Sequence, residues 1–584
     1  MSSVEHTQIK ADTPPPGMRI ERDVPITMRD GLVLRADVFR PDDDAIHPVI
    51  MTHGRYAKGL AWQEGYSYMW QIISREHPDV LEGSSNRYQN WETVDPEKWV
   101  PDGYACVRVD ARGSGRSPGY LDMFSAEEVL DFAECIEWAG TESWSNGKVG
   151  LLGISYYATN QWQVAALKPT HLAAICPWEG AFDYYRDVCR HGGIVNTFVA
   201  SWAPKQVFGL QHGAGERAPR DPNTGELVAG PVTLSDEELA TNRADVAEQI
   251  REHELCDEFY RERTADISRI DVPILSAANW AHHLHTRANF EAYTEAGSTQ
   301  KWLEVHGLEH WTLFYQEYGL DLQKRFFGHF LHGHDTGWAE QPPVTLNIRH
   351  VDGSFERRGE QEWPLARTQW TKLYLDPNDL TLSKTDPGHP GSRSFEALGD
   401  GLTFMTPPVE TKTEITGPLA ARLNVSSTTT DVDLFLTLRV IDPEGKDVTF
   451  VSGIDPRGIP TVGWLRASHR KLDGARSLPY RPYHTHDEVQ PLAPGDVVTV
   501  DVEVWPTSVV LPTGYRLALT VQGKDFELPG DGPWPTFNNT QMRGNGVFVH
   551  RDPVDRPSDR SNSETTLVSS PDRPCYLLVP IIPF

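Results

Sequence analysis

A serine stands in a turn between a strand pattern and a helix pattern. Ser155 lies in the segment Gly153-Ile154-Ser155-Tyr156-Tyr157-Ala158. Apolar residues 149–153 precede this turn as a strand pattern, and residues 157–168 follow it with helical spacing. A strained strand-to-helix turn projects a serine hydroxyl from the end of a sheet, and a small residue such as Gly153 lets the backbone pack closely. The pattern predicts that Ser155 is a nucleophile.

Two histidines lie four residues apart behind a later strand pattern. Residues 302–305 form this pattern, and His306 and His310 follow it. A serine at its ordinary pKa is a weak nucleophile, so it needs an adjacent base. A histidine on the loop after a late strand is well placed for that role. The pattern leaves two candidates for the base, His310 and the competitor His306, which lies nearer the strand end.

Three further histidines form a cluster, namely His282, His283 and His285. With His310 they could in principle bind a metal ion. No cysteine or carboxylate lies at helpful spacing, and serine chemistry needs no metal. We therefore expect neither a metal nor another cofactor.

The elements that must position these residues alternate along the first half of the chain. Short apolar strand patterns lie at 49–52, 105–109 and 149–153, and residues 126–139 have helical spacing. This alternation is typical of a parallel sheet with βαβ crossovers. Residues 187–270 differ, with a Gly- and Pro-punctuated first half and a charged, helical second half, which indicates a helical insertion.

The pattern changes again after residue 336. Apolar residues alternate with period two at 432–440, 498–504 and 517–521, which predicts an all-β sandwich. A chain of 584 residues exceeds the roughly 250–300 residues that one core accommodates. We predict four segments: 1–186 and 271–335 as two parts of one catalytic core, 187–270 as a helical cap, and 336–584 as a β-sandwich domain.

Composition excludes several classes of partner. The net charge is −28 without a dense basic run, which argues against nucleic-acid binding. The six cysteines include no CxxC pair, so a disulfide framework is not expected. No signal peptide or apolar run of membrane-spanning length is found, so we expect a cytoplasmic protein without a membrane partner.

Several motifs in order resemble the cocaine-esterase and X-prolyl-dipeptidyl-peptidase group of α/β-hydrolases, the CocE/NonD type. Gly153-Ile154-Ser155-Tyr156 resembles the group's GxSYxG, although Tyr157 stands where the common GxSxG pattern has its second glycine. The other matches are the D-x-R-G-x-G-x-S loop at 110–117, the approach to the serine at 144–150, the opening hairpin at 29–37 and the jelly-roll signature at 514–517. The resemblance implies an α/β-hydrolase fold with a helical cap insertion and a C-terminal jelly-roll domain.

The resemblance also implies roles for particular residues. The ending G-x-x-H matches Gly307-Leu308-Glu309-His310 and favours His310 as base. An oxyanion hole would combine the backbone N–H of Tyr156 with the hydroxyl of Tyr56.

The triad acid departs from the group's pattern. The group places an aspartate in G-W-x-D, whereas the matching segment here is Asn279-Trp280-Ala281-His282. A histidine cannot accept the Nδ1–H of the base and stabilise an imidazolium. Glu179, directly after the strand pattern at 172–176, is the candidate acid, ahead of Asp183 and Glu309.

The leading hypothesis is a serine acyl-hydrolase that cleaves a small-molecule ester or amide through an acyl-enzyme on Ser155, with His310 as base. Two alternatives stay open within the group: an X-Pro dipeptidyl peptidase, and a β-lactam acylase or amino-acid ester hydrolase. A third is a binding protein with impaired catalysis, motivated by His282 at the aspartate position. Large jelly-roll faces also permit a homodimer.

Overall fold

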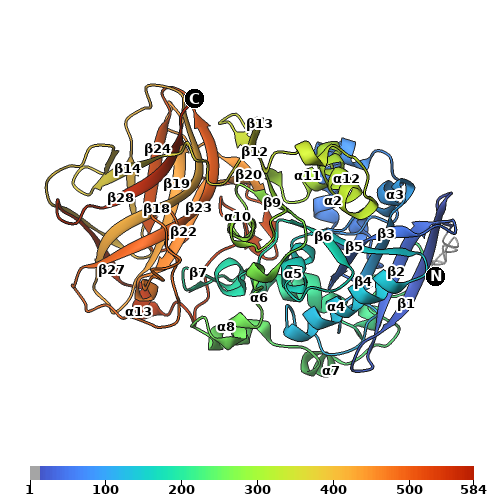
Figure 1. Ribbon diagram of the computed structural model, residues 1–584. Coiled ribbons are helices and arrows are strands. Elements are labelled where there is room, and N and C mark those ends of the chain that lie inside the picture. The colour runs from blue at the N-terminus through green and yellow to red at the C-terminus, as the bar shows by residue number, and fades with distance from the viewer. Residues whose placement is uncertain (1–12) are drawn as a thin grey trace, which may run out of the picture.

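Ser155 directly follows a strand of a ten-stranded sheet in the N-terminal half of the chain (Figure 1). The structure is a computed structural model and describes residues 13–584. The strand order is β1-β2-β4-β3-β5-β6-β9-β10-β12-β13. Pairing is parallel from β4 through β12 and antiparallel at both edges. The strands are β1 (Met18–Thr27), β2 (Val33–Pro41), β3 (His47–Gly54), β4 (Ala105–Asp110), β5 (Ser145–Ile154), β6 (Leu172–Trp178), β9 (Ile274–Asn279), β10 (Lys301–His306), β12 (Val344–Arg349) and β13 (Phe355–Glu360).

The predicted alternation of strands and helices is confirmed in this half. Every residue of β3 and β4 is buried, as expected for parallel strands covered on both faces. The helix after β5 is buried along its whole length. The helices are α1 (Trp62–Gly65), α2 (Ser67–Glu76), α3 (Pro96–Trp99), α4 (Ala126–Thr141), α5 (Tyr156–Ala165), α10 (Thr286–Glu295), α11 (Thr312–Tyr315) and α12 (Glu317–Phe327).

The segment 187–270 consists mainly of short helices and turns. The charged stretch predicted to be helical contains α7 (Asp236–Thr241), α8 (Val246–Glu252) and α9 (Glu258–Arg261). Ser235 and Glu238 form a capping box that starts α7. Ahead of them lie the two-residue strands β7 (Arg190–His191) and β8 (Ile194–Val195) and the helix α6 (Phe198–Trp202).

The C-terminal part is rich in strands. An eleven-stranded sheet has the order β16-β27-β18-β23-β22-β19-β24-β17-β15-β14-β28, with an additional β18–β28 pairing. Its strands are β14 (Gln369–Asp376), β15 (Thr381–Ser383), β16 (Gly391–Glu396), β17 (Leu402–Met405), β18 (Thr413–Ser427), β19 (Asp433–Ile441), β22 (Thr461–Arg466), β23 (Val498–Leu511), β24 (Arg516–Gln522), β27 (Glu564–Ser569) and β28 (Tyr576–Ile582). The hairpin β25 (Thr536–Phe537) and β26 (Thr540–Gln541) and the helix α13 (Ser558–Ser561) complete this part.

The predicted period-two runs fall in β19, β23 and β24. Their inward side chains, such as Leu436 and Val502, share one buried cluster. The first sheet, however, extends beyond residue 336, because β12 pairs with β10 and β13 pairs with β12, so both strands belong to the first sheet. The C-terminal sheet itself therefore starts at β14.

A small mixed sheet joins the two halves next to the candidate base. The strand β11 (Leu308–Glu309) pairs in parallel with β20 (Phe450–Gly453), which pairs with β21 (Asp455–Gly458). Directly after β11, the N–H of His310 donates to the carbonyl of Gly453 at 3.0 Å. The position of His310 thus depends on backbone from the C-terminal half, which lies beside the first sheet in Figure 1.

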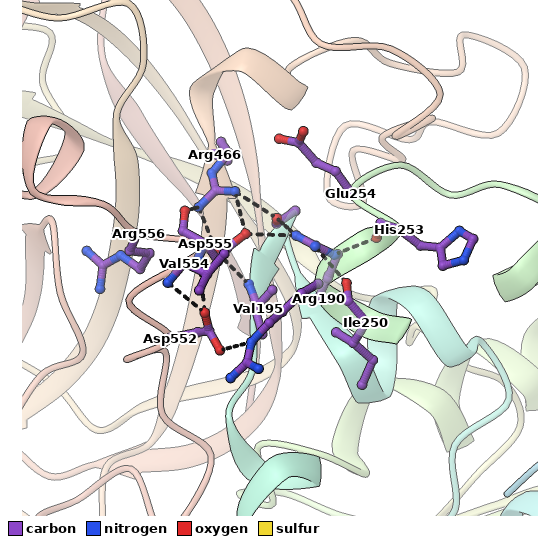
Figure 2. A network of polar contacts seen from close by, with 12 residues as sticks. Arg190, Val195, Ile250, His253, Glu254, Arg466, Asp552, Val554, Asp555 and Arg556 are labelled. Carbon is purple, nitrogen blue, oxygen red and sulfur yellow. Dashed lines mark hydrogen bonds and ion pairs between the residues drawn. The ribbon is translucent and has the colours of Figure 1, made fainter. Parts of the chain in front are cut away.

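A buried ionic network also links the two halves (Figure 2). Asp555 lies 2.9 Å from Arg190 and 2.8 Å from Arg466, and it accepts the N–H of Val195 at 3.1 Å. The two guanidinium groups hold the pKa of Asp555 well below its ordinary value, although burial alone would raise it. Breaking such a buried set leaves uncompensated charge, so the network fixes how the segment 187–270 meets the C-terminal chain.

Among residues 13–584, none of the helices combines the length and apolar character needed to cross a bilayer.

Candidate active site

Ser155 occupies a strained turn between β5 and α5. Its backbone has φ 59° and ψ −110°, a conformation that costs about 1–3 kcal/mol for a residue with a Cβ. The N–H of Ser155 lies 3.1 Å from the carbonyl oxygen of Trp178 and 3.2 Å from that of Glu179. The neighbouring end of β6 therefore holds the turn and aims the serine away from the sheet.

Tyr157 is accommodated although it replaces the glycine of the common pattern. A Cβ added at Gly54 would lie 2.5 Å from Tyr157 Cε1, and one added at Gly153 would lie 2.5 Å from Tyr157 Cβ. The missing side chain at Gly54 provides space for the Tyr157 ring, and the one at Gly153 provides space for the Tyr157 Cβ. Glycines at 54 and 153 thus allow a tyrosine at position 157, where the common pattern has a glycine.

Both predicted oxyanion donors lie beside Ser155. Tyr156 is the first residue of α5, so its N–H belongs to the first turn, where no intrahelical acceptor exists. Tyr56 is buried and lines the same pocket as Ser155. Asp110, from the predicted loop motif, holds the loop of Tyr56 by accepting the N–H of Lys58 at 2.7 Å.

Glu179 follows β6 and contacts two histidines. Its Oε2 lies 2.8 Å from His310 Nδ1, and its Oε1 lies 2.8 Å from His306 Nε2. Burial alone would raise the pKa of Glu179, but the two imidazoles lower it well below the ordinary value, His310 most strongly. The structure thus brings the predicted acid and the predicted base together.

The competitor His306 is occupied on both ring nitrogens. Its Nδ1 lies 2.6 Å from Glu304 Oε2, while its Nε2 contacts Glu179. Burial opposes protonation, yet the two carboxylates raise the pKa of His306 to about 9. The pocket that contains Ser155 is lined by His310 and not by His306, so His306 is suited to orient Glu179.

His310 presents its second nitrogen to another carboxylate. His310 Nε2 lies 3.2 Å from Glu92 Oε1. Burial opposes protonation, but Glu179 and Glu92 together raise the pKa of His310 to about 9. Burial likewise raises the pKa of Glu92 to about 7. Nothing in the sequence patterns singled out Glu92, because it lies on a loop far from the other site residues in the chain.

The serine itself contacts a different histidine. Ser155 Oγ lies 3.0 Å from His285 Nε2, whereas no hydrogen bond joins it to His310 in this conformation of the described chain. Burial, followed by the effect of His310, lowers the pKa of His285 to about 3. The sequence placed His285 in a histidine cluster but did not predict this contact.

His282, at the position of the group's aspartate, packs among histidine rings. Its ring centroid lies 4.6 Å from that of His285 and 4.7 Å from that of His310. Burial lowers its pKa well below the ordinary value. His283 faces elsewhere, with its ring 6.3 Å from that of Trp464.

The weaker candidate acids are engaged away from His310. Asp183 lies 2.7 Å from Arg186, and Glu309 lies 3.0 Å from His77. Neither makes a hydrogen bond to His310 among the described residues. Glu179 is the carboxylate that meets the Nδ1 of His310.

The pocket at Ser155 is lined mainly by apolar side chains from all parts of the chain. The first half supplies Met69, Trp91 and Trp311, the segment 187–270 supplies Phe198 and Trp202, and the C-terminal half supplies Ile454, Phe537 and Phe548. A serine hydroxyl, imidazoles and candidate oxyanion donors inside an apolar pocket are the groups that an acyl-transfer site needs.

Family models match both halves of the chain. Residues 30–312 match the X-Pro dipeptidyl-peptidase (S15 family), and residues 336–553 match the X-Pro dipeptidyl-peptidase C-terminal non-catalytic domain. The protein is a serine hydrolase.

Solved structures define the family more closely. A CocE/NonD family hydrolase from Staphylococcus aureus is 30% identical, with a TM-score of 0.82, and the match covers 97% of this chain and 94% of that one. The chain belongs to the CocE/NonD family of hydrolases, as the sequence motifs predicted.

Two more distant relatives extend the comparison. The cocaine esterase of Rhodococcus sp. is 23% identical, over 96% of this chain and 98% of that protein. An α-amino acid ester hydrolase is 16% identical with a TM-score of 0.67, covering 99% of this chain and 100% of that one, which shows a shared fold.

Proposed function

We propose that this hydrolase cleaves small-molecule esters through an acyl-enzyme on Ser155, with His310 as general base and Glu179 as the triad acid. The proposal includes an α/β-hydrolase fold for the catalytic core, a helical cap at 187–270 and a C-terminal jelly roll. The observation that carries it is the placement of Ser155 in a strained turn, beside two oxyanion donors and the Glu179–His310 pair.

In the first half of the reaction, Ser155 Oγ turns from His285 to His310 Nε2 and transfers its proton there. The oxygen attacks the ester carbonyl, and the N–H of Tyr156 and the hydroxyl of Tyr56 stabilise the oxyanion. The C–O bond to the alcohol breaks, and the alcohol takes the proton from His310. Catalytic hydrogen bonds often form only in the substrate complex, so the resting contact with His285 is compatible with this step.

In the second half, water replaces the alcohol. His310 removes a proton from the water, the hydroxide attacks the acyl carbonyl, and the tetrahedral intermediate expels Ser155, which regains its proton from His310. Throughout, Glu179 accepts the Nδ1–H of His310 and stabilises the imidazolium.

The lining of the pocket favours simple esters with an apolar acyl group. A peptide or amino-acid ester would bring an ammonium group that needs a free acid nearby. Glu92, the carboxylate in the described pocket lining, bonds to His310 instead. The aromatic and aliphatic walls suit an uncharged acyl chain, which gains free energy by leaving water.

Trapping of the acyl-enzyme tests the proposal. We expect a short-chain p-nitrophenyl ester, quenched in acid, to leave an acyl group on the peptide that contains Ser155, as detected by mass spectrometry. A fluorophosphonate probe should label the same peptide. Ester hydrolysis without either modification, or unchanged hydrolysis by Ser155→Ala, would refute the mechanism.

A further inference from the structure

We propose that His282, His285 and His310 bind one transition-metal ion such as Zn²⁺, and that the bound ion reversibly blocks the reactivity of Ser155. The metal site depends only on the arrangement of these three side chains. The inhibitory effect rests on the function proposed above.

The three imidazoles already converge. Each offers one ring nitrogen, these nitrogens lie within 4.8 Å of one another, and all three side chains are buried. Zn–N bonds of about 2.0–2.1 Å place two tetrahedral ligands about 3.4 Å apart. Small rotations of rings that are already in contact are therefore sufficient to close the site around an ion.

The surroundings of His310 match those of a metal ligand. Histidines that bind metals commonly donate their other N–H to a carboxylate, which fixes the ring and raises its basicity. Glu179 holds His310 in this way through Nδ1 at 2.8 Å, so Nε2, which faces Glu92 at 3.2 Å, is the nitrogen that would bind an ion. In addition, His282 Nδ1 is buried without a hydrogen-bond partner among the described residues. Coordination of a metal ion would give this unsatisfied nitrogen a partner.

Two oxygen atoms are placed to complete the coordination. Glu92 Oε1 lies 3.2 Å from His310 Nε2, and Ser155 Oγ lies 3.0 Å from His285 Nε2. Three imidazoles with one oxygen suit borderline ions such as Zn²⁺, Cu²⁺ or Co²⁺, whereas Mg²⁺ and Ca²⁺ prefer oxygen-rich sites. Zn²⁺ is the ion that we expect this site to bind, and Co²⁺ can replace it for spectroscopy.

Coordination and catalysis compete for the same electron pair. The Nε2 lone pair of His310 must accept the proton of Ser155 in the proposed reaction, and a metal ion would occupy it. Bound Zn²⁺ should therefore suppress both acylation by esters and labelling by fluorophosphonates.

The binding experiment uses the full chain after treatment with a chelator and its removal. We expect one equivalent of Co²⁺ to produce the visible absorption of a four-coordinate site, and one equivalent of Zn²⁺ to abolish it. His282→Ala should weaken Zn²⁺ binding beyond the roughly 10–100-fold loss typical of second-shell changes, because a direct ligand is removed. His283→Ala is the matched control, since His283 is the adjacent buried histidine but lies outside the cluster.

The outcomes separate the two proposals. Absence of stoichiometric binding, or equal weakening by His282→Ala and His283→Ala in proteins with wild-type circular dichroism, overturns the metal site. Binding through His282 with unchanged or faster fluorophosphonate labelling overturns the inhibitory effect. Labelling that slows with Zn²⁺ and recovers with a chelator supports it. A protein that binds Co²⁺ through His282 yet hydrolyses no ester supports the site while refuting the proposed function.

Discussion

Two groups of histidines belong to the candidate active site, and their surroundings differ sharply. His306 and His310 contact the carboxylates of Glu304, Glu179 and Glu92, which raise the pKa of both imidazoles to about 9. His282 and His285 make no ion pair with a carboxylate among the described residues, and burial lowers their pKa values. The same residue type is thus driven toward opposite protonation states a few ångströms apart.

The difference shows that proximity alone does not make a general base. His285 is the histidine nearest to the hydroxyl, but a proton accepted there would sit on an imidazolium without a compensating charge. His310 lacks that contact in the resting state, yet Glu179 stabilises its charged form. His310, which contacts carboxylates, is therefore suited to transfer protons. His282 and His285, which lack such contacts, are suited to hold the serine or an ion.

Removal of the nucleophile should have the largest effect. For Ser155→Ala we expect hydrolysis of a short-chain p-nitrophenyl ester to fall by roughly 10⁴-fold or more, as in other enzymes that lose a triad serine. Steady-state kinetics of the purified variant measure the loss, with circular dichroism confirming the fold. Retention of most of the activity would place the chemistry elsewhere.

The comparison between the two histidine groups is tested directly by His310→Gln and His285→Gln. We expect His310→Gln to lower kcat by roughly 10⁴-fold or more, nearly as much as Ser155→Ala, since it removes the base. His285→Gln should cost about 10-fold, because glutamine can still hold the serine hydroxyl by a hydrogen bond. If the order of the two effects is reversed, His285 is the base and the assignment made here is wrong.

Glu179→Gln tests whether catalysis needs the negative charge beside His310 Nδ1. The amide has the same shape but cannot stabilise an imidazolium, so we expect kcat to fall by roughly 10²–10⁴-fold. Glu304→Gln is the matched control, because Glu304 contacts His306 and not His310. Equal effects of the two substitutions would argue that Glu179 serves only to maintain the buried network.

The hydroxyl of Tyr56 contributes one of the two proposed oxyanion donors. Tyr56→Phe should lower kcat by roughly 10²-fold with little change in KM, since the lost hydrogen bond forms mainly in the transition state. Comparison of kcat and KM on the same ester separates this from a packing defect, which would disturb both. An unaltered kcat would remove Tyr56 from the oxyanion hole.

The smallest effect is expected for Glu92→Gln, on the pH dependence. The negative charge of Glu92 helps raise the pKa of His310 to about 9. A base must be neutral to act, so the acidic limb of the kcat/KM profile reports this pKa. Removing the charge lowers the pKa, and the limb should move to lower pH. A shift toward higher pH would show that Glu92 does not act through His310.

Much of the site could be predicted from the chain itself. The strand–turn–helix order around Ser155 is local, so the backbone geometry of a nucleophile follows from neighbouring residues. Glu179 and His310 each follow a strand pattern, and the carboxyl ends of parallel strands meet at one edge of the sheet. Their places after these patterns, together with the family resemblance, led to both residues, and the rule explains why the structure places their side chains 2.8 Å apart.

Other features depended on the tertiary structure. His306 and His310 look alike in the sequence, and they are distinguished because His310 lines the pocket of Ser155, whereas Glu304 and Glu179 hold the two ring nitrogens of His306. The contacts of Ser155 with His285 and of His310 with Glu92 join residues more than one hundred positions apart. In the C-terminal half, the carbonyl of Gly453 accepts the N–H of His310, and the ring of Phe548 packs on His282. Local sequence determines where a strand ends and a turn begins, but only packing between distant segments decides which of several histidines meets a carboxylate, a serine or an apolar wall.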